Sequence, residues 1–248
     1  VMIGANNYGF ADLVTQCMLN WHTSPSWWKD YCYDDSSISS RFTAARQAAE
    51  TTNVRGALQN VATAMANAGY TSTQYTILAQ TYWSPIPRGS GFRYPESGWS
   101  RQSVGGCGVW NRDADWANDT VVAAMNNTTK NAANTSGLAN VKILDLQQAL
   151  NGRRLCENTV GLLEEKGVAN WQSAGAVDKT EWVSQVRTVS AIFPPYQIQE
   201  DSHASYWGQK AMRNCLRQAY NGGNVRGGAC VRAANGLTSA GEPVMGLQ

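Results

Sequence analysis

Apolar residues along the chain alternate between short continuous runs and helical spacing. The runs YTILAQTYW at residues 75–83 and VKILDL at residues 141–146 are rich in β-formers and typical of strands buried in a parallel sheet. The first three residues, VMI at 1–3, are also apolar and stop at Gly4. We interpret them as the end of a further strand.

Helical periodicity separates these runs. The segment between residues 1–3 and the strand predicted at 75–83 has apolar residues spaced four, three and four apart, at Val54, Leu58, Val61 and Met65. Three further helices are predicted, over residues 115–133 with Val121, Val122 and Met125 inward, over 180–191, and over 205–220 before Gly222-Gly223. Strands that alternate with helices predict a doubly wound α/β sheet. About three strands are few for such a sheet, so we expect others upstream of Val1.

Two long segments, residues 21–33 and 84–110, fit neither period. They are rich in Pro, Gly, Ser and aromatic residues, and together with Trp83 they hold six of the ten Trp. Loops of this length inside a compact domain are usually functional or clamped by disulfides. Two interpretations stay open: the aromatics line a substrate cleft, or they only pack to stiffen the loops.

Length and charge limit the class of protein. At 248 residues with 43% apolar residues, the chain can bury one sizeable core, and we expect a single domain over residues 1–248. A formal charge of +2 with no basic run argues against a nucleic-acid partner. No apolar run is long enough to predict stable membrane insertion.

The cysteines predict disulfides. Six are present, with no CxxC pair and no Cys/His spacing typical of zinc, so no metal or other cofactor is expected. We predict three disulfides paired in sequence order: Cys17-Cys32, Cys107-Cys156 and Cys215-Cys230. Other connectivities and six free thiols remain alternatives. Disulfides would indicate an oxidising compartment, so we expect a secreted, extracellular protein.

Three segments, in order along the chain, resemble one enzyme family. The opening VMIGANNYGFADLVTQC resembles the oxyanion-hole block of the SGNH (GDSL-type) hydrolases, usually written GxND. The segment LNGRRLCE at 150–157, then Trp171, and QEDSHASYWGQKAMRNCLRQAYNGG at 199–223 are similar to the closing section of the secreted actinobacterial members. The resemblance runs from Val1 to about Cys230. It implies a flavodoxin-like doubly wound parallel sheet, lacking its N-terminal strands here, and an ester hydrolase.

The resemblance implies roles for particular residues. Asn6, in the turn that starts at Gly4, matches the asparagine whose amide faces the oxyanion. His203 matches the catalytic histidine, a general base. The family's acid lies three residues before that histidine, at Glu200, with Asp201 as the alternative. The competing interpretations are an ordinary turn for Asn6 and an ordinary helix-start residue for His203.

The chain departs from the family pattern in two ways. Asn7 stands where the motif has Asp, and Ala204 stands where many members have Pro; neither removes a proton carrier or the oxyanion donor. The GDS block with the nucleophilic serine is absent. The sequences Gly89-Ser90-Gly91 and Gly98-Trp99-Ser100 do not follow a predicted strand and open a helix, as a nucleophile elbow does.

Three hypotheses account for the missing serine. In the first, which we favour, this chain is the C-terminal part of a serine lipase or esterase, and an N-terminal chain of the same precursor carries the serine. In the second, the protein is a catalytically inactive SGNH-like binding protein. In the third, another chain completes an acyltransferase. The substrate would be an acyl ester, with a lipid as the leading class.

Overall fold

The centre of the fold is a mostly parallel sheet. The structure is a computed structural model that describes residues 1–186 and 201–248. Four strands lie in the order β1-β2-β3-β4, with bounds β1 Ile77–Gln80, β2 Val141–Asp145, β3 Gly228–Leu237 and β4 Pro243–Leu247. The first three run parallel, and β4 pairs antiparallel with β3. The α/β class and the strands predicted within residues 75–83 and 141–146 are confirmed.

The first residues of the chain extend this sheet beyond β1. The Val1 amino group donates to the Leu78 carbonyl at 2.7 Å, and the Gln80 amide donates to the Val1 carbonyl at 2.8 Å. This is the hydrogen-bond pattern of a parallel pair. Met2 packs into the core under α8, whereas Ile3 packs into the core under α3, as the alternating faces of an extended segment require. The segment forms no regular strand, yet it continues the parallel order.

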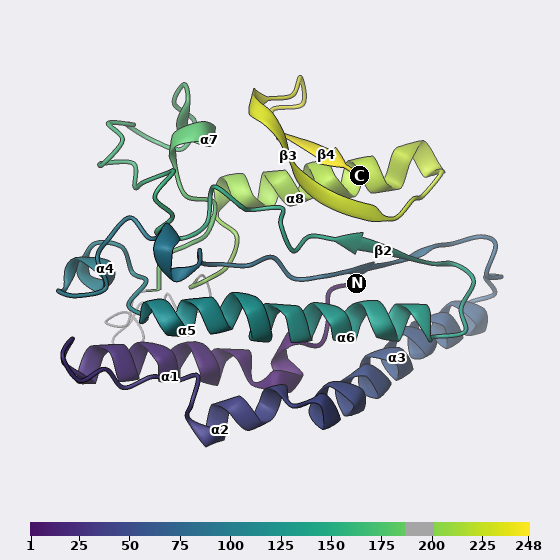
Figure 1. The fold of residues 1–248 in the computed structure, drawn as a ribbon. Coiled ribbons are helices and arrows are strands. Elements are labelled where there is room, and N and C mark those ends of the chain that lie inside the picture. The colour runs from purple at the N-terminus through teal and green to yellow at the C-terminus, as the bar shows by residue number, and fades with distance from the viewer. Residues whose placement is uncertain (187–200) are drawn as a thin grey trace.

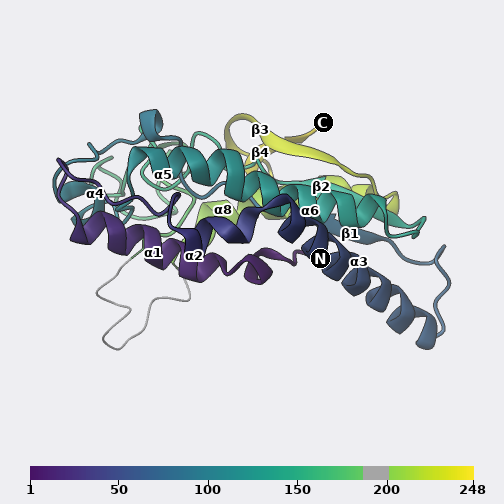
Figure 2. The same cartoon turned by 60° about the horizontal axis from the view of Figure 1, so that its bottom comes forward.

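Helices cover both faces of the sheet (Figures 1 and 2). Figure 1 places α8 on one side of the sheet, and α1, α3, α5 and α6 on the other. Their bounds are α1 Phe10–Thr23, α3 Ala44–Asn67, α5 Asn111–Trp116, α6 Ala123–Asn134 and α8 Tyr206–Tyr220. A π-helical stretch joins α5 to α6, and the short helices are α2 Ser36–Ser39, α4 Ser100–Ser103 and α7 Ala176–Lys179.

Side-chain alternation along the strands separates two cores. Leu78 and Leu144 belong to the core under α8, while Ile77 and Ile143 belong to the core under α3 and α6. The inward faces predicted for the two helices below the sheet are correct: Val54 and Leu58 are buried in α3, and the predicted valines and Met125 are buried around the start of α6.

The structure corrects three expectations about the elements. Residues 180–186 are not helical: Thr180 bridges to Gly161 and Val183 bridges to Ala204, while 187–191 lie outside the described residues. The start of the segment assigned to the loop 21–33 is the last turn of α1. The count of about three strands was too low, because β3 and β4 follow α8.

All three predicted disulfides are present. Cys17 pairs with Cys32, Cys107 with Cys156, and Cys215 with Cys230. The first closes the loop after α1, and the third joins α8 to β3. The second joins the long loop 84–110 to the segment after β2.

Candidate active site

Both sequence-predicted blocks lie at the carboxyl edge of the parallel strands. The turn at Gly4 directly follows residues 1–3, which pair parallel with β1. His203 lies three residues before α8, which connects β2 to the parallel strand β3 and therefore begins at the carboxyl end of β2. In open α/β sheets this edge is where ligands bind.

The N-terminal turn has the backbone shape that its sequence requires. Gly4 has φ +114°, a left-handed conformation that favours glycine, and residues Ala5–Tyr8 then form one 3-10 turn. The Ala5 amide donates to the Tyr82 hydroxyl at 3.2 Å, which fixes the turn to the segment after β1. The Asn6 carbonyl accepts from the Gly9 amide at 3.0 Å, and Asn6 itself is exposed. The Asn6 amide is thus presented to solvent at this edge.

Asn7, which stands where the SGNH motif has Asp, is held by a buried carboxylate. Its side-chain amide donates to Glu50 Oε2 on α3 at 2.7 Å. Glu50 is only 2% exposed, and it also accepts from Asn53 at 2.9 Å and pairs with Arg46 at 2.8 Å. An Asp at position 7 would place a second carboxylate against a buried one. Asn supplies a hydrogen-bond donor instead, so an amide at position 7 fits the Glu50 carboxylate on α3.

The segment that carries His203 is an extended turn held by backbone hydrogen bonds. The Ser184 amide donates to the His203 carbonyl at 2.8 Å, and the Ser202 amide donates to the Ser184 carbonyl at 3.2 Å. Ser202 has φ +59°, which is strained for a residue with a side chain. Strain of this kind clusters at functional sites.

The His203 ring is oriented by a backbone group. Its Nδ1 lies 2.9 Å from the Asp201 carbonyl oxygen, and the residue is exposed. Because a carbonyl only accepts, Nδ1 carries the proton and Nε2 is left as the acceptor, which is the tautomer a general base needs. The Asp201 contact is therefore made by its main chain. Glu200, ranked first as the acid, lies outside the described residues.

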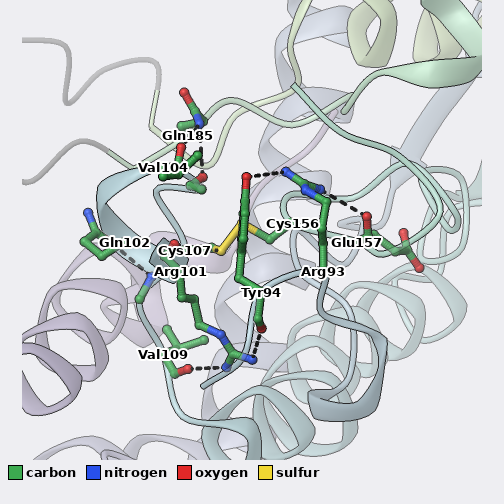
Figure 3. Close-up of a disulfide and its surroundings, with 12 residues drawn as sticks. Arg93, Tyr94, Arg101, Gln102, Val104, Cys107, Val109, Cys156, Glu157 and Gln185 are labelled. Atoms are coloured by element: carbon green, nitrogen blue, oxygen red, sulfur yellow. Dashed lines mark hydrogen bonds between the residues drawn. A yellow bond between two sulfur atoms is a disulfide. The ribbon is translucent and has the colours of Figure 1, made fainter. Parts of the chain in front are cut away.

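A chain of contacts ties the histidine segment to the Cys107–Cys156 disulfide (Figure 3). The Val186 amide donates to the Gly106 carbonyl at 2.9 Å, and the Gln185 amide group donates to the Val104 carbonyl at 2.8 Å. Both acceptors lie in the long loop 84–110, just before Cys107. The position of His203 therefore depends on a disulfide-linked loop.

Buried Arg101 shapes this loop from inside. Its guanidinium donates to the carbonyls of Tyr94 and Val109 and to the Asn111 side chain, each at 2.8 Å, and lies over the Phe92 ring (Figure 3). Burial lowers the pKa of Arg101 to about 10, although the nearby Glu96 opposes the shift. Three oxygen acceptors and an aromatic ring thus hold the buried Arg101 cation. Among the described residues, no carboxylate forms a hydrogen bond with it.

An apolar cavity of about 60 Å³ lies between α1 and the segment that carries His203. On the first wall, α1 contributes Phe10, Leu13, Val14, Cys17 and Met18. We call α1, together with the Gly4–Tyr8 turn that precedes it and does not line the cavity, the asparagine side. The other wall, the histidine side, is residues 183–186 with 202–204, which contribute Val186 and Ser202. The cavity is several times larger than the space one water needs and is apolar, so it suits part of an alkyl chain.

Asp113 is a buried polar group on the cavity wall. It is 2% exposed, its Oδ1 accepts from the Tyr33 amide at 3.0 Å, and its Oδ2 has no hydrogen-bond partner. Burial raises its pKa to about 6, against the lowering effect of the Tyr33 and Cys32 amides. Sequence reasoning did not select Asp113, because an Asp at the start of an amphipathic helix usually caps it or faces solvent.

No serine in the described residues is placed as a nucleophile beside His203. Ser84 donates to the Ile86 carbonyl at 2.9 Å and contacts Asn118 Oδ1 at 2.5 Å. Within residues 1–186 and 201–248, no serine hydroxyl forms a hydrogen bond to the His203 ring. Gly89–Gly91 forms a 3-10 turn and Ser100 begins the four-residue α4, and neither directly follows a strand.

Asp145, at the end of β2, is engaged in structure. It accepts from the Thr81 hydroxyl at 2.7 Å and from the Gln147 amide at 3.0 Å, and it pairs with Lys130 at 2.5 Å. Burial alone would raise the pKa of Asp145, but these three donors outweigh it and lower the pKa. The carboxylate thus joins β1, β2 and α6.

Comparison with protein-family models, with curated proteins and with solved structures finds no match for this chain. The described residues contain no group of three His, Cys, Asp or Glu side chains placed to hold a metal ion. Nor does any helix in the described part of the chain have the length and apolar character needed to cross a membrane.

Proposed function

We propose that this chain supplies the oxyanion donor and the general base of a secreted serine ester hydrolase, a lipase or esterase of the SGNH type. The observation that carries the proposal is the His203 ring, exposed at the carboxyl edge of the sheet with its Nδ1 on the Asp201 carbonyl at 2.9 Å. The Asn6 turn at the same edge supports it. The three disulfides fit the oxidising compartment that secretion implies.

The residues divide the chemistry between them. Nε2 of His203 accepts the proton as the serine oxygen attacks the ester carbonyl, and returns it to the leaving alcohol. The Asn6 side-chain amide donates to the oxyanion as it forms. The apolar cavity between the two walls receives part of the acyl chain, which favours esters with an aliphatic acyl group.

The nucleophile, in this proposal, belongs to an N-terminal chain of the same precursor. Residues 1–3 pair parallel with β1 on the side away from β2, so a serine-bearing strand would extend the sheet next to them. A serine after that strand would lie at the carboxyl edge, beside both Asn6 and His203. Backbone pairing across the sheet would hold the two chains together.

The first test concerns the partner chain. Protein purified from its native source, analysed by intact mass and N-terminal sequencing, should contain a second polypeptide with a GDS sequence, and a fluorophosphonate probe should label that polypeptide. A single chain that no probe labels would overturn the proposal and favour the inactive binding protein.

The second test concerns the assigned residues. In the two-chain protein, Asn6→Ala should lower kcat for a p-nitrophenyl acyl ester by roughly two to three orders of magnitude. His203→Ala should lower it by roughly six. His22→Ala is the matched control, because it removes the other histidine and should leave turnover unchanged. Release of an acylated acceptor instead of free acid would identify an acyltransferase.

The third test concerns the acid. Asp201→Asn keeps the carbonyl that contacts Nδ1, so it should change kcat only a few-fold if the main chain orients the ring. Glu200→Gln tests the residue that the family resemblance ranks first. A loss of three to four orders of magnitude in either variant, on the scale of a triad carboxylate, would assign the role to that side chain.

A further inference from the structure

Two loops lie at the end of the molecule where α1 ends and α4 lies (Figures 1 and 2). Both loops carry tryptophans that are exposed to solvent. Trp27 is 81% exposed, Trp28 73% and Trp99 61%. Leu19 on α1 and Val104 after α4 are also exposed. Trp is highly buried on average, and clustered exposed apolar residues mark interaction surfaces. We call these five residues the aromatic face.

The loops beneath this face are fixed to one another. Lys29 forms an ion pair with Glu96 and lies 5.3 Å from the Trp110 ring centroid. The Trp21 indole donates to the Glu96 carbonyl at 3.2 Å. Trp99 packs edge-on against Trp21, with ring centroids 6.1 Å apart. The exposed rings therefore stand on a preorganised base, which reduces the ordering cost of binding.

Ring geometry distinguishes between a sugar and a lipid surface. The planes of the two most exposed rings, Trp27 and Trp28, make an angle of 69°. Two rings at this angle do not form one flat platform on which a sugar chain could stack. Indoles with mixed orientations, next to exposed aliphatic side chains, suit the interfacial layer of a lipid assembly, where Trp is enriched.

The nearby charges specify the kind of lipid surface. Lys29, the cation beneath the aromatic face, is neutralised by Glu96. Asp30, which follows Lys29 in the loop, is exposed. An acidic neighbour opposes an anionic headgroup layer and is tolerated by a zwitterionic one.

We propose that the aromatic face adsorbs reversibly to a neutral, zwitterionic lipid surface. Leu19 of the face lies on α1, next in sequence to Met18, which lines the cavity. The inference needs no catalysis, so it can be tested apart from the proposed hydrolase.

The test is co-sedimentation of the purified protein, with any chain that accompanies it, with vesicles of ether-linked phosphatidylcholine, which no esterase can cleave. Wild type should bind, with blue-shifted tryptophan fluorescence that brominated lipid quenches. Trp27→Ser with Trp28→Ser should weaken partitioning roughly tenfold or more. Tyr220→Ser is the matched control, since Tyr220 is an aromatic residue 60% exposed on α8. Unchanged thermal unfolding would show that each variant folds.

Three outcomes would overturn the proposal: wild type fails to bind the vesicles, the double variant binds as well as wild type, or anionic vesicles bind more tightly than phosphatidylcholine. A soluble polysaccharide that binds through Trp27 and Trp28 while vesicles do not would assign the face to sugars. Loss of ester turnover with vesicle binding intact would refute the hydrolase alone.

Discussion

The two walls of the candidate site are held in place by different means. On the asparagine side, the Gly4 turn follows directly from sheet pairing, and Asn7 is fixed by the buried Glu50 of α3. On the histidine side, residues 183–186 and 202–204 belong to neither helix nor regular strand, and they rest on the loop that ends at Cys107. The position of Asn6 therefore depends on the fold itself, whereas the position of His203 depends on a disulfide-linked loop.

Loss of the Cys107–Cys156 disulfide should produce the largest difference in amide hydrogen exchange between the histidine side and the asparagine side. The bond closes a loop with a sequence separation of 49, so the double variant Cys107→Ala, Cys156→Ala should lose about 4 kcal/mol of unfolding free energy in a chain-entropy estimate. Denaturant unfolding measures this loss. Under native conditions, the amides of Ser184 and Val186 should exchange faster with deuterium, while the Gly9 amide should not.

The matched control is removal of Cys215–Cys230, which has a separation of 15 and joins α8 to β3 away from the loop. It should cost about 3 kcal/mol and leave the exchange of Ser184 and Val186 unchanged relative to other amides. If the Gly9 amide exchanges as much faster as the Ser184 and Val186 amides in the Cys107→Ala, Cys156→Ala variant, the two sides do not depend on different parts of the fold.

Asp113, on the part of the cavity wall formed by α5, offers a pH test of a buried group outside the histidine side. Its pKa is raised from 3.8 to about 6 by burial, so the folded protein binds this proton more tightly than the unfolded chain. Stability from this group is therefore fully present below about pH 4, falls as pH rises to about 6 and is then constant, by about 3 kcal/mol in total. Asp113→Asn should remove this slope, and its stability should reach or exceed that of wild type at pH 8.

The measurement is unfolding free energy from pH 4 to pH 8 for wild type and variant, because the difference between the curves isolates Asp113. Glu164→Gln, at an exposed carboxylate that does not contribute to the Asp113 shift, is the control and should track wild type. Parallel curves for Asp113→Asn and wild type would contradict the assignment. Exchange at Ser184 should stay unchanged, since Asp113 supports Tyr33 and not the histidine segment.

The sequence predicted the parts of the fold in which local pattern and tertiary environment agree. The runs that became β1 and β2 place apolar side chains in the cores on both faces of the sheet, and the apolar stripe on α8 stops at glycines. Pairing of cysteines in sequence order was also correct. The strands and the helix follow from residue spacing, whereas the cysteine pairing was one of several connectivities that the sequence allows.

The missed parts depend on partners distant in sequence. Trp182 and Val183 have helical spacing, yet Trp182 donates to the Val177 carbonyl at 2.9 Å and Val183 bridges to Ala204, so tertiary contacts prevail over periodicity. In β3, GACVRAANGL mixes glycine with exposed polar residues, and only pairing with β2 and β4 makes it a strand. The same limit applies to the site. Motifs identified Asn6 and His203, but the Asp201 carbonyl and Asp113 emerge only from the fold.

The smallest expected effect concerns Asn7 and sharpens the view of the asparagine side. Asn7→Asp restores the family motif but places a carboxylate where an amide now donates to Glu50 Oε2 at 2.7 Å. Arg46, at 2.8 Å from the same carboxylate, offsets part of the repulsion, so we expect a loss of about 1 kcal/mol at pH 7. Adding Glu50→Gln supplies a new donor and should recover the stability, which a double-mutant cycle of unfolding free energies measures. If Asn7→Asp is as stable as wild type at pH 7, the Asn7–Glu50 contact does not explain the departure from the motif.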